Sequence, residues 1–365
     1  MKKSLLFMCV LAVALASCSR GELPDEPVTP TPPDPGKEDL VEIRLQSAVN
    51  PLEANTKTPF IGDITTSTNE LTANVLMTKT AGGFAAGSTI EQKSMTFKAN
   101  KTNTELWNTK QYYPVDDSPV YLCGLYPADK VWPQGTDEST AVYTFDGKTD
   151  VMAAPAVKTT KTEAQGSQYK ELVFRHLLTN LIIKAEADLT ETDVTATQVQ
   201  EAWGAITSIE LVKVQGDPLK RMNKVTVTLK DATAATATAF SLDGGSYTVP
   251  FYKMSGKNFP GTGVSEPFAF TDDAFTSTPI PDPAAAVAYS IIAPVIAAGT
   301  EDFTLLVKTA NATSAGVEVP VKLLTTGDTQ GKYCIVTLKF KNTTISATAS
   351  VAAWADGGTA DTTIQ

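Results

Sequence analysis

The sequence contains a single histidine, His176, among its 365 residues. One histidine cannot supply the two or three imidazole ligands of many zinc sites, and histidine-dependent nucleophilic catalysis would have to use this one side chain. His176 lies in the apolar stretch FRHLLTN, where we expect a buried, hydrogen-bonded structural residue. No nucleophile elbow, phosphate-binding loop or dinucleotide-binding glycine pattern occurs in a matching context. The sequence therefore argues against an enzyme and predicts no metal or cofactor.

Positive charge is also scarce. The chain has 30 Lys and Arg against 40 Asp and Glu, which gives a net charge of −10 with histidine neutral. Nucleic-acid binding needs clustered positive charge, so we expect no nucleic-acid partner. An acidic balance of this kind suits a soluble exported protein.

The N-terminus carries an uninterrupted apolar run. There, Lys2 and Lys3 precede LLFMCVLAVALA (5–16), a run of signal-peptide length that is shorter than the ~20 residues of a membrane-spanning helix. The run ends in Leu-Ala-Ser-Cys (15–18), which resembles a bacterial lipobox. We expect residues 1–17 to be a lipoprotein signal peptide and Cys18 to carry the lipid. The alternative is an ordinary secretory signal followed by an incidental cysteine.

The segment after Cys18 is rich in proline and acids and poor in large apolar residues. It reads SRGELPDEPVTPTPPDPGK (19–37), a composition that cannot bury enough surface to fold. We expect residues 18–37 to form a lipidated, disordered, Pro-rich stalk.

Cysteine is sparse once the N-terminus is set aside. Cys123 and Cys334 both lie in strand-like apolar runs. We expect two buried free thiols, with a single disulfide between them as the alternative.

The rest of the chain has the pattern of a β-rich protein. Short runs rich in Val, Thr and Ala, such as VYLCGLYP (120–127) and CIVTLKFK (334–341), are separated by Gly, Pro, Asn and Asp. The length exceeds that of one ordinary core. We expect an all-β fold of two tandem β-sandwich domains, at 38–189 and 190–365. One segment, TETDVTATQVQEAWG (190–204), is either a short helix capped by Thr190 with Asp193 or a loop.

Two acidic pairs and a group of aromatics are the remaining candidates for a ligand site. Asp116-Asp117 and Asp272-Asp273 lie in turns without the regular ligand spacing of a calcium loop, so we interpret them as solvated loop acids. Aromatic residues of the first domain would either pack in the core and turns, which we favour, or form a sugar-stacking platform: Trp107, Tyr112, Tyr113, Tyr126 and Trp132.

Several ordered stretches together resemble the fimbrillin family of Bacteroidetes, the type V pilins and their fimbrillin-like lipoprotein relatives. They follow the lipobox and stalk over nearly the whole mature chain: YYP (112–114), VYLCGLYP (120–127), TDVMAAPA (149–156), FRHLLTNLIIKA (174–185), AWGAITSIEL (202–211) and YCIVTLKF (333–340), leading to ATASVAAWADGG (347–358).

This resemblance implies two transthyretin-like sandwich domains and a lipoprotein precursor that reaches the outer membrane. It also implies that a trypsin-like protease cuts after an arginine in or beside the first strand, and that a donor strand from a neighbouring subunit fills the groove. A sandwich that lacks an edge strand exposes a hydrophobic slot and unpaired backbone groups, which favours strand addition.

The candidate cut site is Arg44, with Arg20 in the stalk as the alternative. Arg44 lies in EDLVEIRLQSAV (38–49), which alternates as a half-buried strand with two faces: Val41, Ile43 and Leu45 against Glu42, Arg44 and Gln46. A cut at Arg20 would release the lipid and leave the strand in place. The other possibility is that Arg44 is only the polar-face residue of a permanent strand.

The end of the chain is the candidate donor strand. It alternates with one small, apolar face: Ile345, Ala347, Ala349 and Val351. Alternatively, this segment is an ordinary last strand of the second domain, completed by Trp354.

Together these patterns predict a structural, accessory or tip subunit of a cell-surface fimbria that supports adhesion. Its expected partners are other fimbrial subunits in a homo- or heteropolymer, the outer membrane through the lipid, and a host protein or glycan. The alternative function is that of a surface-exposed glycan-binding lipoprotein.

Overall fold

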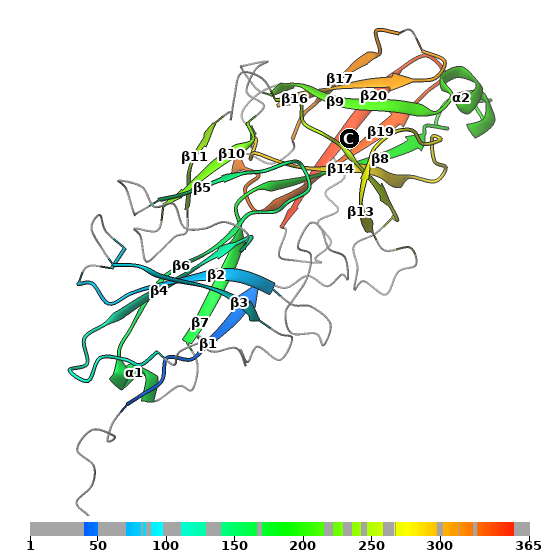
Figure 1. The fold of residues 1–365 in the computed structure, drawn as a ribbon. Helices are drawn as coiled ribbons and strands as arrows, with labels where there is room; N and C mark the ends of the chain where they lie inside the picture. The colour runs from blue at the N-terminus through cyan, green and yellow to red at the C-terminus, as the bar shows by residue number, and fades with distance from the viewer. Residues whose placement is uncertain are drawn as a thin grey trace, which may run out of the picture. The chain divides into compact units, whose positions relative to one another are not determined.

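The computed structural model describes residues 40–49, 71–81, 83–84, 89–97, 111–128, 140–165, 170–214, 222–228, 236–241, 247–257, 266, 268–297, 302–312, 314–323 and 327–353. The statements that follow concern this part of the chain, which is built mainly of short strands with two short helices (Figure 1).

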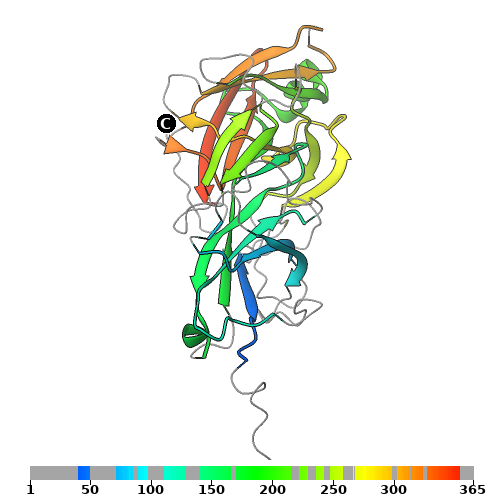
Figure 2. The ribbon, with the colours of Figure 1, turned by 60° about the vertical axis from the view of Figure 1, so that its left-hand side comes forward.

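The first half of the chain forms a six-stranded sheet. In spatial order its strands are β1 (Leu45–Val49), β7 (Lys170–His176), β6 (Met152–Thr159), β4 (Val120–Tyr126), β2 (Leu71–Thr78) and β3 (Glu91–Phe97). The β1 strand runs parallel to β7, whereas the other neighbouring pairs are antiparallel. Figures 1 and 2 show β1 beside β7 at one edge of this sheet.

The second half contains two larger sheets. The first is ordered β13 (Ala269–Ala274), β12 (Tyr252–Ser255), β14 (Ala285–Ile292), β8 (Thr179–Ala187), β19 (Lys332–Phe340) and β20 (Ile345–Ala353). The other is ordered β17 (Val317–Val321), β16 (Phe303–Thr309) and β9 (Ile206–Val214). Alternate apolar residues of both sheets share one buried cluster, as in a sandwich. The predicted all-β fold of sandwich domains is thus confirmed.

Two small sheets complete the strand pairing. One is ordered β11 (Thr236–Ser241), β10 (Lys224–Thr228) and β5 (Thr140–Thr144), and the other joins β15 (Ile296–Ala297) to β18 (Gly327–Asp328). Since β5 comes from the first half of the chain and β10 from the second, the two halves are joined by main-chain hydrogen bonds as well as by the covalent chain.

The two helices are α1 (Lys161–Gln165) and α2 (Ala196–Trp203). The segment that the sequence left open between helix and loop is α2. Its N-cap is Thr195, whose hydroxyl accepts from the Gln198 backbone, while the Gln198 side chain accepts from the Thr195 backbone. This capping box lies later in the chain than the pair expected at Thr190 and Asp193.

The junction between the two large six-stranded sheets is only two residues long. Leu177 and Leu178 separate β7 from β8, and both are almost completely buried. The Leu177 N–H donates to the carbonyl of Val151, and the Gly331 N–H donates to the carbonyl of Leu178. A cluster of apolar side chains from both halves surrounds this junction, so the connection is part of a core rather than a linker.

The expected division at 189/190 falls after β8, although β8 pairs with β14 and β19 of the second half. We therefore propose that the boundary between the sandwiches lies between β7 and β8.

Gly124 in β4 allows a close approach between strands, because a Cβ added there would overlap the ring of Phe174. We expect Gly124→Ala to lower the free energy of unfolding by about 1–3 kcal/mol, the usual effect of overpacking a core. Chemical denaturation monitored by tryptophan fluorescence measures this change. Adding Phe174→Leu should recover part of the loss, and equal stability of Gly124→Ala and wild type would contradict this packing.

Candidate processing site and assembly strand

Arg44 lies immediately before β1, at a point where the chain changes its pairing partner. The preceding residues pair with the 111–113 segment: the Ile43 N–H donates to the carbonyl of Gln111 (2.8 Å), and the Tyr113 N–H donates to the carbonyl of Val41 (3.0 Å). From Leu45 onward the chain pairs with β7. The single strand expected over 38–49 is therefore divided into two short paired segments that meet at Arg44.

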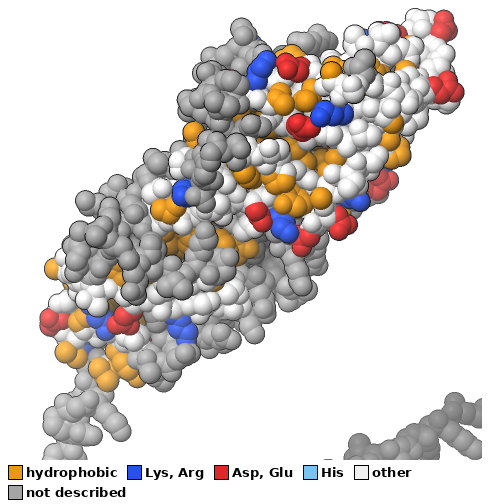
Figure 3. Space-filling model, turned by 45° about the horizontal axis from the view of Figure 1, so that its top comes forward, with side chains coloured by type: hydrophobic (Ala, Val, Ile, Leu, Met, Phe, Trp, Pro, Cys, Tyr) orange, Lys and Arg blue, Asp and Glu red, His pale blue; other side chains and the backbone are white. Residues whose placement is uncertain are grey.

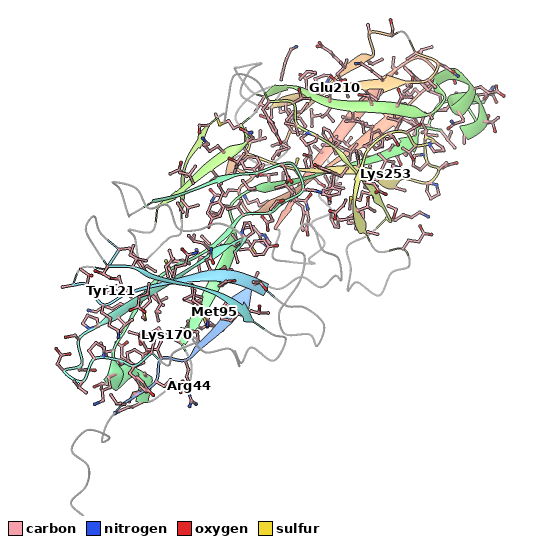
Figure 4. The ribbon with its side chains drawn as sticks, in the orientation of Figure 1. Arg44, Met95, Tyr121, Lys170, Glu210 and Lys253 are labelled. Carbon is pink, nitrogen blue, oxygen red and sulfur yellow. The ribbon has the colours of Figure 1, made fainter. Side chains whose placement is uncertain are left out.

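The two neighbours of Arg44 are anchored in the core. Ile43 and Leu45 are each only 1% exposed and pack in the apolar cluster on one face of the first sheet. The side chains of Glu42 and Arg44 project from the opposite face of the chain, as the alternation predicted. Figure 4 shows Arg44 extending outward at the start of β1.

Three contacts hold Arg44 itself. Its carbonyl accepts a hydrogen bond from the N–H of Lys170 (2.8 Å). Its Nε and Nη2 both donate to Oε2 of Glu42 at 3.3 Å. The Arg44 side chain is 45% exposed and that of Glu42 only 10%. The guanidinium is thus within reach of solvent, while its peptide bond is bound to the sheet.

The candidate donor strand is β20, at the edge of the second six-stranded sheet. It pairs antiparallel with β19 from Ile345↔Phe340 to Ala353↔Lys332. The predicted apolar face turns towards the sandwich core, where Ala349 is buried and the other three side chains are partly buried: Ile345, Ala347 and Val351. Ser346 and Thr348 are exposed. In this structure β20 completes its own sandwich.

No protein-family model matches the sequence, and no curated protein matches it either. Solved structures do match. A candidate cell adhesion protein from Bacteroides uniformis is 15% identical with a TM-score of 0.50, over 86% of this chain and 98% of that chain. A candidate cell adhesion protein from Bacteroides ovatus is 13% identical with a TM-score of 0.49, over 86% and 98%. A fimbrial assembly protein from Parabacteroides distasonis is 9% identical with a TM-score of 0.40, over 85% and 96%.

The likeness is one of fold. At this level of identity only the arrangement of strands is shared with the Bacteroides uniformis protein, and it extends over nearly the whole of that chain. Proteins with this likeness include candidate cell adhesion and fimbrial proteins of Bacteroidetes, in agreement with the resemblance drawn from the sequence.

His176 has the structural role expected from the sequence. Its Nδ1 lies 2.6 Å from Oδ2 of Asp150, and the two side chains are 5% and 0% exposed. The pair lies beside the Leu177–Leu178 junction. The other carboxylate oxygen of Asp150 has no hydrogen-bond partner among the described residues. A buried carboxylate of this kind depends on its one strong partner.

The two acidic pairs lie in different kinds of structure. Asp116-Asp117 lies in a turn region as expected, whereas Asp272-Asp273, also expected in a turn, lies in the edge strand β13. Asp117 accepts from the backbone and hydroxyl of Thr162 at 2.8 and 2.9 Å, and these bonds, the backbone one first, lower the pKa of the Asp117 carboxyl. Asp272 lies 3.9 Å from the ammonium of Lys148. Among the described residues, no group of three or more His, Cys, Asp or Glu side chains is placed to hold a metal ion.

The described aromatic side chains of the first domain are buried or partly buried, as packing in the core and turns predicts. Tyr113 is 3% exposed, its hydroxyl lies 3.4 Å from that of Thr159, and burial raises its pKa. Tyr126 is partly buried against the same core, and Tyr112 is half-buried opposite Glu42. On the face shown in Figure 3, apolar side chains occur in small groups among charged and polar ones.

The two remaining cysteines are buried free thiols, as predicted. Burial raises the pKa of Cys334 to about 12 and that of Cys123 further, so neither forms a thiolate near neutral pH. Other predicted residues lie outside the described part of the chain: Cys18, Arg20, Trp107, Trp132 and Trp354. Within the described part, no helix has the length and apolar character needed to cross a membrane.

Two contacts of the site were not predicted from the sequence. They are the ion pair between Glu42 and the Arg44 guanidinium, and the pairing of the 111–113 segment with residues 41–43. The alternation placed Glu42 on the same face as Arg44, because residues two apart in an extended chain lie on the same face, and this spacing could have indicated the ion pair. No local signal indicates the 111–113 segment.

We expect His176→Leu to lower the free energy of unfolding by about 3–5 kcal/mol, because it leaves the carboxylate of Asp150 buried without its partner. Urea denaturation at neutral pH measures the loss. The double variant His176→Leu with Asp150→Asn should lose less than the single variant, since no charge is then stranded. An equal or larger loss in the double variant would rule out a stranded charge as the cause.

Proposed function

We propose that the protein is a structural, accessory or tip subunit of a cell-surface fimbria, exported as an outer-membrane lipoprotein anchored through Cys18. Its role is assembly and adhesion rather than catalysis. Assembly proceeds by cleavage after Arg44 and by insertion of a strand from a neighbouring subunit. The observation that carries this proposal is the position of Arg44, exposed at a sheet edge between two core-anchoring residues.

A cut at this position would have a defined structural result. The cut lies between Arg44 and Leu45. The N-terminal fragment, here called the severed part, ends with residues 40–44, while β1 keeps its pairing with β7. The severed part is held by Ile43 and Val41, and full burial of such side chains contributes about 1.5–3 kcal/mol each. Its few backbone hydrogen bonds contribute about 1 kcal/mol each. Once it is no longer covalently joined to β1, the severed part is held by these contacts alone and can dissociate.

Departure of the severed part leaves a vacancy beside the 111–113 segment. The space of Ile43 opens into the cluster that contains Leu45, and the Gln111 carbonyl and Tyr113 N–H lose their partners. Unpaired strand edges next to an apolar slot favour addition of an extended segment with apolar residues two apart.

The β20 strand has the chemistry of such a segment. It is an edge strand, it carries no charge over ISATASVAA, and its inward face has small side chains. To act as donor it must leave β19, which exposes part of its own core. The donated strand would restore contacts that the cut has removed in a neighbouring subunit.

Limited trypsin treatment of the purified protein should produce a fragment that begins at Leu45, because Arg44 is exposed at an edge and Arg175 lies within the paired β7 strand. Intact-mass spectrometry and N-terminal sequencing identify the product. Arg44→Ala should abolish this fragment, and Arg175→Ala should leave it unchanged. Resistance of Arg44 while other sites are cut would exclude processing at this position.

After the cut, the protein should form oligomers that resist SDS, because an inserted strand pairs with the freed backbone groups of the 111–113 segment and fills the apolar space of Ile43. A synthetic peptide with the sequence of residues 344–352 should block these oligomers, as seen on unboiled gels. The same peptide with Asp in place of Ala347 and Ala349 should not block them. Oligomers that form equally with both peptides would exclude β20 as the donor.

A further inference from the structure

The ion pair between Glu42 and Arg44 differs from an ordinary surface pair. Both Nε and Nη2 of Arg44 bind the same oxygen of Glu42, and the Glu42 side chain is only 10% exposed. In the pair between Lys213 and Glu318, the two side chains are 50% and 60% exposed. Attraction between charges rises as water is excluded, so Glu42 binds its cation more strongly than Glu318 does.

The backbone fixes Glu42 in this position. Its neighbours Val41 and Ile43 are hydrogen-bonded to the 111–113 segment, and Glu42 itself lies opposite Tyr112 in an antiparallel bridge. The second oxygen of Glu42, Oε1, is buried without a hydrogen-bond partner among the described residues. A carboxylate that is held rigidly and poorly solvated depends on the guanidinium of Arg44.

We propose that Glu42 is the residue that restrains processing at Arg44, because it holds the guanidinium that a trypsin-like protease must bind in its own anionic pocket. This inference rests on the proposed function and names the regulation of the same site. The partner it implies is an endopeptidase whose primary specificity pocket carries a carboxylate and competes with Glu42 for the same cation.

Cleavage of the Arg44–Leu45 bond has two requirements, one for every protease and one for proteases that bind the arginine side chain. Hydrolysis adds water across the Arg44–Leu45 peptide bond and leaves a carboxylate on Arg44 and an ammonium on Leu45. Any protease must first free the Arg44 carbonyl from the N–H of Lys170. Only a protease that reads the arginine side chain must also separate it from Glu42. The restraint by Glu42 is therefore specific to guanidinium-reading proteases.

At Arg175, pairing of the backbone protects the peptide bond from proteolysis without any restraint on the side chain from the described residues. Arg175 is exposed, but β7 is bonded to β1 on one side and to β6 on the other. Arg44 precedes the strand at a sheet edge, where backbone protection is weaker. A side-chain restraint has an effect at Arg44 because the backbone there opens more easily.

The test compares two proteases on one bond. Trypsin cuts Arg44–Leu45 by reading Arg44, whereas thermolysin cuts before bulky apolar residues and reads Leu45. Glu42→Gln should raise the rate of trypsin cleavage at this bond by at least about fivefold, the upper end of the effect of an exposed ion pair, because Glu42 is poorly solvated. Thermolysin cleavage of the same bond should stay unchanged. Glu318→Gln, which removes a pair in the second sandwich, should change neither rate.

Each other outcome overturns the proposal. Equal acceleration by both proteases would mean that Glu42 only stabilises the strand, and an unchanged trypsin rate would mean that it restrains nothing. If neither protease cuts this bond in either variant, the backbone rather than Glu42 protects the site. If trypsin cuts neither variant while thermolysin cuts both, something other than Glu42 withholds the Arg44 side chain. Oligomer formation by the cut protein is scored separately, so loss of assembly with the expected cleavage rates counts against the proposed function and not against Glu42.

Discussion

The burial of Leu177 and Leu178 between β7 and β8 is the constraint on which the rest of the structure depends. These two residues carry the chain from one six-stranded sheet to the other without a polar linker, inside a cluster formed by both halves. Gly331 supports the junction with a positive φ of 63°, at a point where a Cβ would press on the carbonyl of His176. A side chain there would separate the strands that the junction brings together.

The position of β7 in this arrangement explains why the processing site is tied to the whole fold. Its last residue, His176, is held by Asp150 next to the junction, and its first residue, Lys170, binds the carbonyl of Arg44. The same strand therefore ends in the shared core and begins at the candidate cut site. The backbone at Arg44 is therefore held by a strand that cannot shift without disturbing that core.

The edge strands of the three larger sheets are of two kinds: some carry charged side chains or proline, which we call guarded, and the others carry neither and are unguarded. Charged side chains or proline occur on β3, β9, β13 and β17, including Pro320 in β17 and the acidic pair in β13. Such residues discourage pairing with another chain. The LQSAV of β1 and the ISATASVAA of β20 carry neither. The two unguarded edges belong to the strand beside the candidate cut and to the candidate donor.

The sequence predicted those properties that depend on near neighbours along the chain. Alternation placed Ile43 and Leu45 inside and Glu42 and Arg44 outside, because side-chain direction in a strand has a period of two. The strand-like character of the second half and the apolar face of β20 followed from the same rule. The free, buried state of Cys123 and Cys334 followed from their apolar surroundings.

Pairing between distant segments was not predictable in this way. Nothing near Arg44 indicates that it precedes a strand parallel to β7, or that residues 41–43 pair with 111–113. The sequence also does not indicate the break between β7 and β8, because two leucines are as compatible with a continuing strand as with a junction. For α2, several threonines precede the helix and could form its N-cap. The structure uses Thr195, because Thr195 and Gln198 each accept a hydrogen bond from the backbone N–H of the other.

These two kinds of information meet at Arg44. Local alternation decides that an acid two residues earlier lies on the same side of the chain as the arginine. Distant pairing decides that this acid is poorly solvated and fixed in place. Neither alone would restrain a protease: an acid on a free strand would be screened by water, and a paired strand without the acid would leave the guanidinium open. A restraint that depends on both is present only in the folded subunit, and it is lost when residues 41–43 separate from the 111–113 segment.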